Sequence, residues 1–465
     1  MNEVIEMKKT VFLLISILMI FTVFSMANGI TAQSVINQET INQINTYNAS
    51  HGLPWVAKLN PKFEGKTIQE LSILNGWKPL PKQIMMDMIT RHLTTTDNMI
   101  MSSYTLFNPL TMDESSIPSN YDLRDVNGVS YVTPIKDQGW HGTCWAFSTV
   151  ETLESAMMVQ GVVGDYPFLG ATPILSTQFV SYHDVDWDLL SSNNWWSVQD
   201  SNYDGGGSQY FSMYNSIRYG TPPAVDFPYQ AYENTPWISW NPQNPDWQKD
   251  LVHTTGTMLL LGAPEESYYF NVDYNSYINA IKTMIMKYGS VSVAYMVPAS
   301  FFSYSSGIFV APATPTYVGG HAVQIVGWKD NLTASNGVTY PTVWIVRNSW
   351  GTTWGMNGYW MQPAVTEAEY DSGKVPGWKF AAFGEWFYSP IFSPKNLDWK
   401  AADFNNDDSV NMEDYNMLID ALNETNPSSS IIAKYDIGIP KDNRIDGNDV
   451  AEFMYLWNEA AAAGH

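Results

Sequence analysis

Apolar residues follow two spacings along this chain, one typical of helices and the other of strands. After Cys144, apolar residues recur at intervals of three and four as far as Met157, and no Gly or Pro occurs before Gly161. This spacing predicts a helix whose first turn holds Cys144. Continuous apolar runs follow His321 and precede Asn348, and each run predicts a buried strand.

The N-terminal part combines one long apolar run with two short helical patterns. Residues 11–26 are apolar, follow two lysines and lead into small residues, which predicts a secretory signal peptide over residues 1–27. The run has about 16 residues, short for a membrane span of roughly 20, and an uncleaved anchor is the alternative. Helical spacing at 41–47 and 68–74, followed by a polar, Met-rich tail, predicts a removable pro-segment and linker over residues 28–116.

Composition limits the compartment and the partners of the chain. Hydrophobic residues make up 45% and aromatic residues 14%, which allows a large core. The formal net charge of −23, from 46 acidic and 23 basic residues, argues against nucleic acid as a partner and against a membrane partner after signal removal. Because Cys144 is the only cysteine, no internal disulfide forms, which in a secreted protein fits a reducing setting.

Four residues far apart along the chain carry the groups that thiol-based acyl transfer needs. A thiol is mostly protonated near neutral pH, so a histidine must take its proton, and the N–H groups of a helix start stabilise the thiolate. Cys144 and His321 are predicted for this pair, with the neutral amide of Asn348 orienting the imidazole. The backbone N–H of Cys144 and the side-chain amide of Gln138 are predicted to bind the oxyanion. Each residue alone is more often structural, but their occurrence together in this order favours a catalytic site.

Longer motifs around these residues resemble those of the papain/cathepsin family of cysteine peptidases. His-Gly-Thr-Cys-Trp at residues 141–145 resembles the family signature around its cysteine. Further resemblances are to the family's mature N-terminus at 117–124, its Leu-Ser-x-Gln segment at 175–178, its glycine pair at 205–207 and its Asn-Ser-Trp-Gly block at 348–355. The resemblance spans residues 117–390, and residues 55–76 also resemble the short pro-segment of cathepsin B-like members.

The resemblance implies a fold and a set of binding residues. It implies an α+β peptidase domain over residues 117–390 with two lobes, a helical left lobe and a β-barrel-like right lobe. Cys144 is the implied nucleophile, His321 the base and later acid, and Trp350 a shield of the His–Asn pair from water. The implied substrate-binding residues are Gly206, Gly207, Trp350 and Trp354. The implied substrates are polypeptides, and the implied catalysis needs no cofactor.

The chain departs from the family at the cysteine motif and in length. His141 stands where the family has a disulfide-forming cysteine, and we expect a packing role for it rather than a catalytic one. Thr143 replaces the family's Ser or Ala. Insertions predicted at 162–173, 184–203 and 232–272 would reshape the substrate cleft. The sequence lacks the paired-histidine loop of dipeptidase members, which favours endopeptidase action.

After residue 400 the composition becomes acidic, and oxygen donors recur with the spacing of a calcium loop. Ca²⁺ takes six to eight oxygen ligands from such a loop. The predicted ligands are Asp403, Asn405, Asp407, Ser409 (through its backbone carbonyl), Asn411 and Asp414. A helix is expected over residues 415–422. The alternative is an acidic turn that only caps this helix.

A second, imperfect copy favours a paired calcium module. Its predicted ligands are Asp436, Asp442, Asp446 and Asp449, and Asp436 occupies the first position only if two residues are inserted nearby. An apolar helix over 450–457 follows. The two loop–helix units resemble a type I dockerin, which implies a small all-α calcium-binding domain over 401–460 behind a linker at 391–400. The implied partner is a cohesin-bearing scaffold protein.

Three interpretations of function follow. The first is a secreted, pro-segment-controlled cysteine endopeptidase that a dockerin-like module tethers outside the cell to a scaffold or cell surface. The second is a catalytically inactive papain-like domain that serves as a binding module. The third is an active peptidase whose calcium module only stabilises the protein.

Overall fold

The computed structural model describes most of the predicted peptidase domain and pro-segment. The described residues are 30–79, 104–106, 117–182, 206–230, 242–260, 273–372, 379, 386–392, 399–407, 409–437, 444–445, 449–450, 453 and 456–457. The predicted signal peptide, most of the linker before residue 117 and the predicted ligands Asp442 and Asp446 lie outside these residues. No helix in the described ranges has both the length and the apolar character to cross a membrane.

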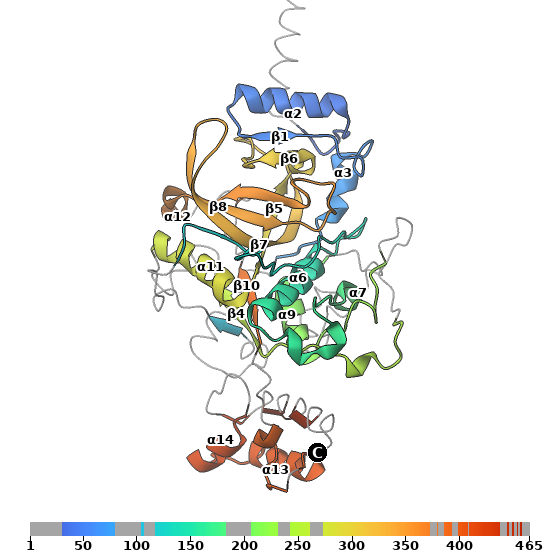
Figure 1. The fold of residues 1–465 in the computed structure, drawn as a ribbon, viewed down its shortest axis with the longest axis vertical. Coiled ribbons are helices and arrows are strands. Elements are labelled where there is room, and N and C mark those ends of the chain that lie inside the picture. Colours follow the sequence, from blue (N-terminus) through green and yellow to red (C-terminus); the bar gives the residue numbers. More distant parts are fainter. Residues whose placement is uncertain are drawn as a thin grey trace, which may run out of the picture.

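An eight-stranded sheet forms the larger part of the fold (Figure 1). Its order is β2-β4-β10-β5-β7-β8-β9, with β3 also paired to β7, and only the β2–β4 pair is parallel. The strands are β2 (Tyr104–Leu106), β3 (Asn120–Asp122), β4 (Gly256–Leu260), β5 (Val291–Pro298), β7 (Tyr317–Thr333), β8 (Thr339–Arg347), β9 (Tyr359–Pro363) and β10 (Phe387–Ile391). The strands predicted after His321 and before Asn348 are confirmed as β7 and β8.

The expected β-barrel-like lobe is an open sheet in the described part of the chain. β2 and β9 stand at opposite ends of the strand order and are not paired with each other. The outer edge of β9 contacts a segment that is not part of a named strand. There the Phe309 N–H donates to the Met361 carbonyl at 2.9 Å. β4 also lies inside the predicted insertion at 232–272, so part of that insertion belongs to the sheet.

The central helix α6 (Cys144–Val159) begins at the predicted residue and joins the sheet to a group of helices. Every side chain from Cys144 to Met157 is buried, because the helix has neighbours on all sides. Toward the sheet, the Ser148 hydroxyl donates to the Val323 carbonyl of β7 at 2.7 Å. Toward the helices, Thr149 and Ser212 hydroxyls lie 2.6 Å apart. The fold is therefore α+β, with α6 at the boundary between a helical and a β-rich lobe (Figure 1).

The remaining helices of the domain flank α6 and the sheet. On the helical side lie α7 (Thr177–Tyr182), α9 (Gln209–Arg218) and the short η4 (Val163–Asp165) and η5 (Pro167–Leu169), while α11 (Tyr274–Tyr288) and α12 (Glu367–Ser372) pack near the sheet. The Asp273 carboxylate begins α11 by accepting the Ser276 N–H at 3.1 Å, a typical N-cap.

The N-terminal segment folds against the sheet and adds a strand to the predicted peptidase domain. The predicted helical patches are confirmed as α2 (Gln38–Ser50) and as α3 (Ile68–Leu71) with η1 (Ser72–Leu74). Between them, β1 (Trp55–Ala57) pairs antiparallel with β6 (Tyr304–Gly307), which the sequence did not predict. Several apolar side chains of this segment belong to the main core: Trp55, Ala57, Phe63, Ile68, Leu71 and Leu74.

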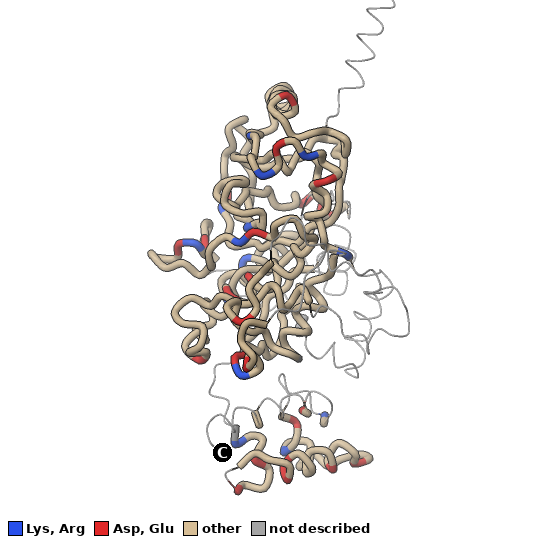
Figure 2. Tube along the Cα trace, turned by 90° about the vertical axis from the view of Figure 1, so that its right-hand side faces the viewer, with Lys and Arg blue, Asp and Glu red and all other residues tan. Residues whose placement is uncertain are grey.

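The C-terminal residues form a separate small helical unit. The helices are α13 (Met412–Leu422), which confirms the predicted one, and α14 (Ser429–Tyr435), beside the short η9 (Trp399–Ala401). Their core holds Ala402, Phe404, Val410, Leu418, Ile437, Phe453 and Leu456. Figure 2 shows acidic positions recurring along this unit.

Candidate active site

Cys144 lies at the N-terminal end of α6, fully buried. The N–H of Ala322, the residue after His321 in β7, lies 3.4 Å from its Sγ. Burial raises the pKa of the thiol to about 11, while N–H groups of Ala322, Gly76, Trp145 and Trp77 act in the opposite direction. The start of α6 therefore lies beside β7, the strand that carries His321.

His321 and Asn348 meet across neighbouring strands. The His321 Nε2 lies 2.8 Å from the Asn348 Oδ1, and the same oxygen accepts the Ser349 N–H at 2.8 Å. Because Oδ1 only accepts, Nε2 must carry the proton, which leaves Nδ1 with the lone pair in the neutral ring. Nδ1 is buried and has no hydrogen-bond partner among the described residues. The ring thus keeps one basic nitrogen available for a proton.

The imidazole is shielded from water. Its ring lies 4.8 Å from that of Trp350, which is itself fully buried and stacks on Phe302 at 4.9 Å. Burial lowers the pKa of His321 to about 4. The hydrogen bond with Asn348 and the Leu74 carbonyl both act to raise this pKa, but their effect is smaller. Trp354 lies behind Trp350, at 5.2 Å between ring centroids, inside the main core.

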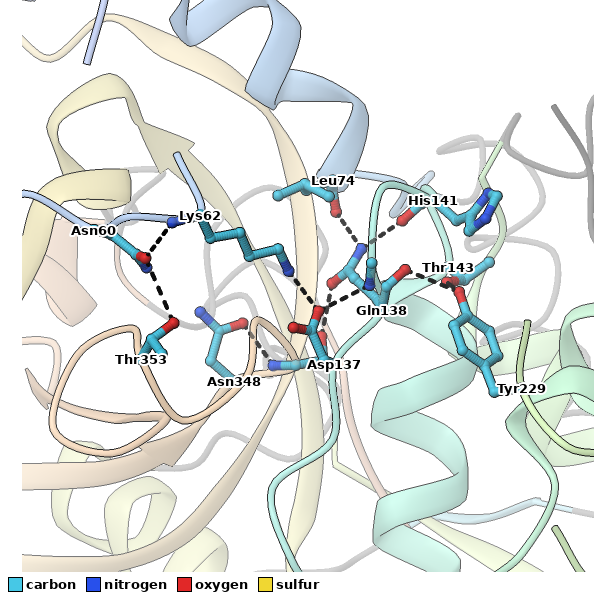
Figure 3. A network of polar contacts seen from close by, with 12 residues as sticks. Asn60, Lys62, Leu74, Asp137, Gln138, His141, Thr143, Tyr229, Asn348 and Thr353 are labelled. Atoms are coloured by element: carbon cyan, nitrogen blue, oxygen red, sulfur yellow. Dashed lines mark hydrogen bonds and ion pairs between the residues drawn. The ribbon is translucent and has the colours of Figure 1, made fainter. Parts of the chain in front are cut away.

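Gln138 directs its side-chain amide toward Leu74 (Figure 3). We call the site between Gln138, Gly207 and Gly320, where residues 74–78 lie, the cleft. Its Nε2 donates to the Leu74 carbonyl at 3.0 Å and to the His141 carbonyl at 2.6 Å. The Ser349 hydroxyl donates to its Oε1 at 2.7 Å, which fixes the orientation of the amide. The donor predicted for an oxyanion therefore holds a carbonyl oxygen of the N-terminal segment.

That N-terminal segment runs through the cleft as an added strand. The Trp77 N–H donates to the Gly320 carbonyl at 3.0 Å. The Gly207 N–H donates to the Gly76 carbonyl at 2.9 Å, and the Gly207 carbonyl accepts the Lys78 N–H at 2.9 Å. Gly207, one of the two glycines predicted to hold substrate backbone, thus holds Gly76 and Lys78.

The segment approaches other backbone so closely at Gly76 that only a glycine fits there. A Cβ on Gly76 would lie 1.7 Å from the Gly142 carbonyl oxygen, and one on Gly206 would lie 2.1 Å from the Gly76 oxygen. Nearby, Lys62 forms an ion pair with Asp137, the residue before Gln138 (Figure 3). Backbone packing and charge therefore both join this segment to the cleft wall.

Several residues at the site were missed from the sequence. Leu74 and Gly76 occupy the cleft, Ser349 orients Gln138, and Tyr229 contacts the turn before Cys144. No local pattern marks them, because each contact joins segments more than 60 residues apart in the chain. His141 is buried with its ring edge-on to Tyr229, which agrees with the packing role expected for it.

Comparison with known proteins identifies the family. The family model described as "Papain family cysteine protease" matches residues 117–371. The chain belongs to this family. It is therefore a papain-family cysteine protease that acts on polypeptides, and the resemblance predicted from the motifs is confirmed.

Individual relatives are distant in sequence. The chain is 25% identical over 291 residues to cathepsin B-like cysteine proteinase 4 of Caenorhabditis elegans, covering 61% of this chain and 82% of the relative. It is 27% identical over 309 residues to a cathepsin L-like peptidase of Aedes aegypti, covering 65% and 77%. The solved structure of proCathepsin B S9 from Trypanosoma congolense has a TM-score of 0.49 at 20% identity, covering 76% of this chain and 98% of that one.

The first predicted calcium loop closes on a buried carboxylate. Asp414 accepts the N–H groups of Phe404 at 2.8 Å, Asn405 at 3.2 Å and Asn411 at 3.1 Å. Asp403 accepts the Asp407 N–H at 3.1 Å. These carboxylate and amide oxygens are of the kind that Ca²⁺ prefers. Among the described residues, however, no three His, Cys, Asp or Glu side chains form a group arranged to hold a metal ion.

The second loop repeats the closing contact of the first. The Ile437 N–H donates to Asp449 at 2.7 Å, as the Phe404 N–H does to Asp414. Asp436 and Asp449 are both buried, at 5% and 2% exposure. Since Ile437 corresponds to Phe404 and Asp449 to Asp414, Asp436 takes the first position of a loop that is two residues longer. The other two predicted ligands, Asp442 and Asp446, lie outside the described residues.

Proposed function

We propose that this chain is the zymogen of a secreted cysteine endopeptidase, with Cys144 as nucleophile. The observation that carries the proposal is the way residues 74–78 occupy the cleft. Backbone groups of Gly76 and Trp77 act on the pKa of the thiol, and Gln138 and Gly207 hydrogen-bond Leu74 and Gly76. A segment bound in this way occupies the place where a substrate would bind.

The geometry supports a thiolate mechanism once the segment leaves. His321 Nδ1 takes the thiol proton, and the sulfur attacks the carbonyl carbon of the scissile bond. The Cys144 N–H and the Gln138 amide stabilise the oxyanion. His321 then returns the proton to the leaving amine as the C–N bond breaks. Water, deprotonated by the same nitrogen, hydrolyses the thioester and frees the thiol.

Substitution of the nucleophile and the base tests this assignment. Cys144→Ala and His321→Ala are expected to abolish peptide hydrolysis after activation, with circular dichroism unchanged. Peptide turnover near that of the wild type in either variant would contradict the proposal. An irreversible thiol-directed epoxide separates an active peptidase from an inactive binding domain, because only an active site is labelled, at Cys144, in proportion to lost activity.

Endopeptidase action is the part of the proposal that rests on sequence. The seven histidines of the chain include no adjacent pair of the kind that binds a substrate carboxylate in dipeptidases. A peptide-library profile of the activated protein is expected to show internal cleavage. Release of dipeptides alone from the C-terminal end would refute this part.

For the C-terminal unit, we propose a dockerin-like module that binds Ca²⁺ and a cohesin-bearing scaffold. The repeated closing contact of Asp414 and Asp449 supports two related loops. Pull-down of the full chain with cohesins is expected to succeed with Ca²⁺ and fail with a chelator. Absence of binding together with a Ca²⁺-dependent rise in melting temperature would favour a module that only stabilises the protein.

A further inference from the structure

The turn from Gln138 to Cys144 carries both predicted oxyanion donors at its two ends. Gln138 supplies its side-chain amide and Cys144 its backbone N–H, so their separation depends on the shape of this turn. Gly139 within it has φ of 64°, a left-handed conformation that favours glycine. Because Cys144 is the only cysteine, no disulfide holds the turn.

One phenol from a distant segment spans this turn. Tyr229 Oη lies 3.0 Å from the Gln138 carbonyl and 2.7 Å from the Thr143 Oγ1 (Figure 3). The carbonyl only accepts, so Tyr229 donates its single proton to it. Thr143 must then donate to Tyr229, which gives one directed chain from Thr143 through Tyr229 to Gln138.

The ring of Tyr229 is itself held in place. It packs edge-on against Phe147, one turn further along α6, at 4.7 Å between centroids, and against His141 at 6.4 Å. Aromatic contacts of this geometry fix a ring as well as bury area. The hydroxyl is therefore positioned by the same helix that carries Cys144.

We propose that Tyr229 is a positioning residue that sets the distance between the two oxyanion donors. It contacts residues that bear these donors or lie next to them. The inference rests on the proposed roles of Gln138 and Cys144. Removing the hydroxyl should weaken binding of the oxyanion and leave the nucleophile itself unchanged.

Tyr229→Phe tests the proposal, because it removes both hydrogen bonds and keeps the ring. Full-length variants are activated with the same added protease, and active sites are counted by epoxide titration. We expect kcat to fall about tenfold, less than the loss of a whole donor, with KM within about twofold of wild type. Affinity for a peptide aldehyde, which forms an oxyanion on Cys144, should fall by a similar factor. Alkylation of Cys144 by iodoacetamide, which forms none, should keep its rate.

Companion variants test whether Thr143 and Tyr229 act through one hydrogen-bond chain. Thr143→Ala should also lower kcat, whereas Thr143→Ser, which keeps the hydroxyl, should have a kcat near that of the wild type. The double variant Thr143→Ala with Tyr229→Phe should lose little more activity than Tyr229→Phe alone, because both changes remove the same chain of hydrogen bonds. Tyr166→Phe is the matched control, because its hydroxyl bonds a remote carbonyl, that of His253, at 3.3 Å.

The outcomes distinguish failure of the inference from failure of the proposed function. Wild-type kcat in Tyr229→Phe, with a loss in Gln138→Ala, would overturn the role of Tyr229 alone. Equal losses in kcat and alkylation rate would also overturn it, since they would indicate general disorder of the site. Wild-type kcat in Gln138→Ala would instead refute the oxyanion assignment itself.

Discussion

At the scale of residues, the same burial shifts the thiol and the imidazole of the site in opposite directions. It raises the pKa of Cys144 to about 11 and lowers that of His321 to about 4. At pH 7 both groups are therefore neutral while residues 74–78 cover them. Removal of the covering segment restores solvent to both groups and favours the charged pair.

The first prediction concerns the reactivity of Cys144. In the intact chain, the iodoacetamide rate at Cys144 should be low at neutral pH and climb as pH rises toward 11, because only the thiolate reacts. After proteolytic activation, the rate at pH 7 should increase more than about tenfold. Mass spectrometry of the modified peptide measures both rates. Equal rates before and after activation would show that the segment does not control the thiol.

At the scale of elements, the pro-segment and helix α6 each depend on close contacts of single residues. Residues 74–78 enter the cleft where a side chain at Gly76 would collide with Gly142 backbone. In α6, Glu151 is buried beside Arg347 of β8, with 2.9 Å between Oε1 and the guanidinium nitrogen. Arg347 precedes Asn348, so this ion pair anchors the strand end that orients His321.

The second prediction follows from the space at Gly76. In Gly76→Ala the added methyl would lie 1.7 Å from the Gly142 oxygen, so the segment should leave the cleft. The uncleaved chain should then hydrolyse a small fluorogenic peptide that the intact wild type does not. Gly164→Ala is the matched control, because its Cβ meets no atom within 4 Å. Uncleaved Gly76→Ala with no activity would contradict the occlusion model.

The third prediction concerns stability and pH. Burial raises the pKa of Glu151 from 4.5 to about 7, a larger effect than the opposing one of Arg347. Between about pH 4.5 and pH 7, Glu151 therefore keeps its proton in the folded protein and has lost it in the unfolded chain. The free energy of unfolding should fall as pH rises through this range, because deprotonation favours the unfolded chain. In Glu151→Gln the melting temperature should decline less across this window. An identical decline in both proteins would refute the prediction.

At the scale of the whole molecule, the peptidase domain and the C-terminal unit have separate cores. The small core around Phe404 and Leu418 shares no residue with the main core. Changes in the proposed calcium loops should therefore leave the cleft unaffected. The pro-segment differs, because its apolar residues belong to the main core and its removal must expose apolar surface.

The fourth prediction tests this independence. Asp403→Ala combined with Asp407→Ala should lower Ca²⁺ affinity in calorimetric titration, because two carboxylate ligands are lost. Hydrolysis of small peptides should not change. Asp420→Ala combined with Glu424→Ala, which alters acidic residues outside the loops, is the control. Unaltered Ca²⁺ binding in the first pair would remove the loop assignment.

The sequence by itself determined the helices and strands whose formation depends on residues close together in the chain. The helix beginning at Cys144 follows from apolar residues at helical spacing, and the strands beside His321 and Asn348 follow from continuous apolar runs. Helix α13 was expected from its place after the first acidic loop. Family membership also followed from the motifs, because reacting groups need particular residue types at particular places.

Only the tertiary structure decided how distant segments meet. The open sheet, the pairing of β1 with β6, residues 74–78 in the cleft and the contact of Tyr229 with Gln138 had no local signal. Each depends on backbone groups and shapes that come together only when the chain is folded. Most of these contacts use at least one backbone group, such as the carbonyl of Leu74 or Gln138, and any residue type can supply such a group, so one sequence does not reveal which residues meet.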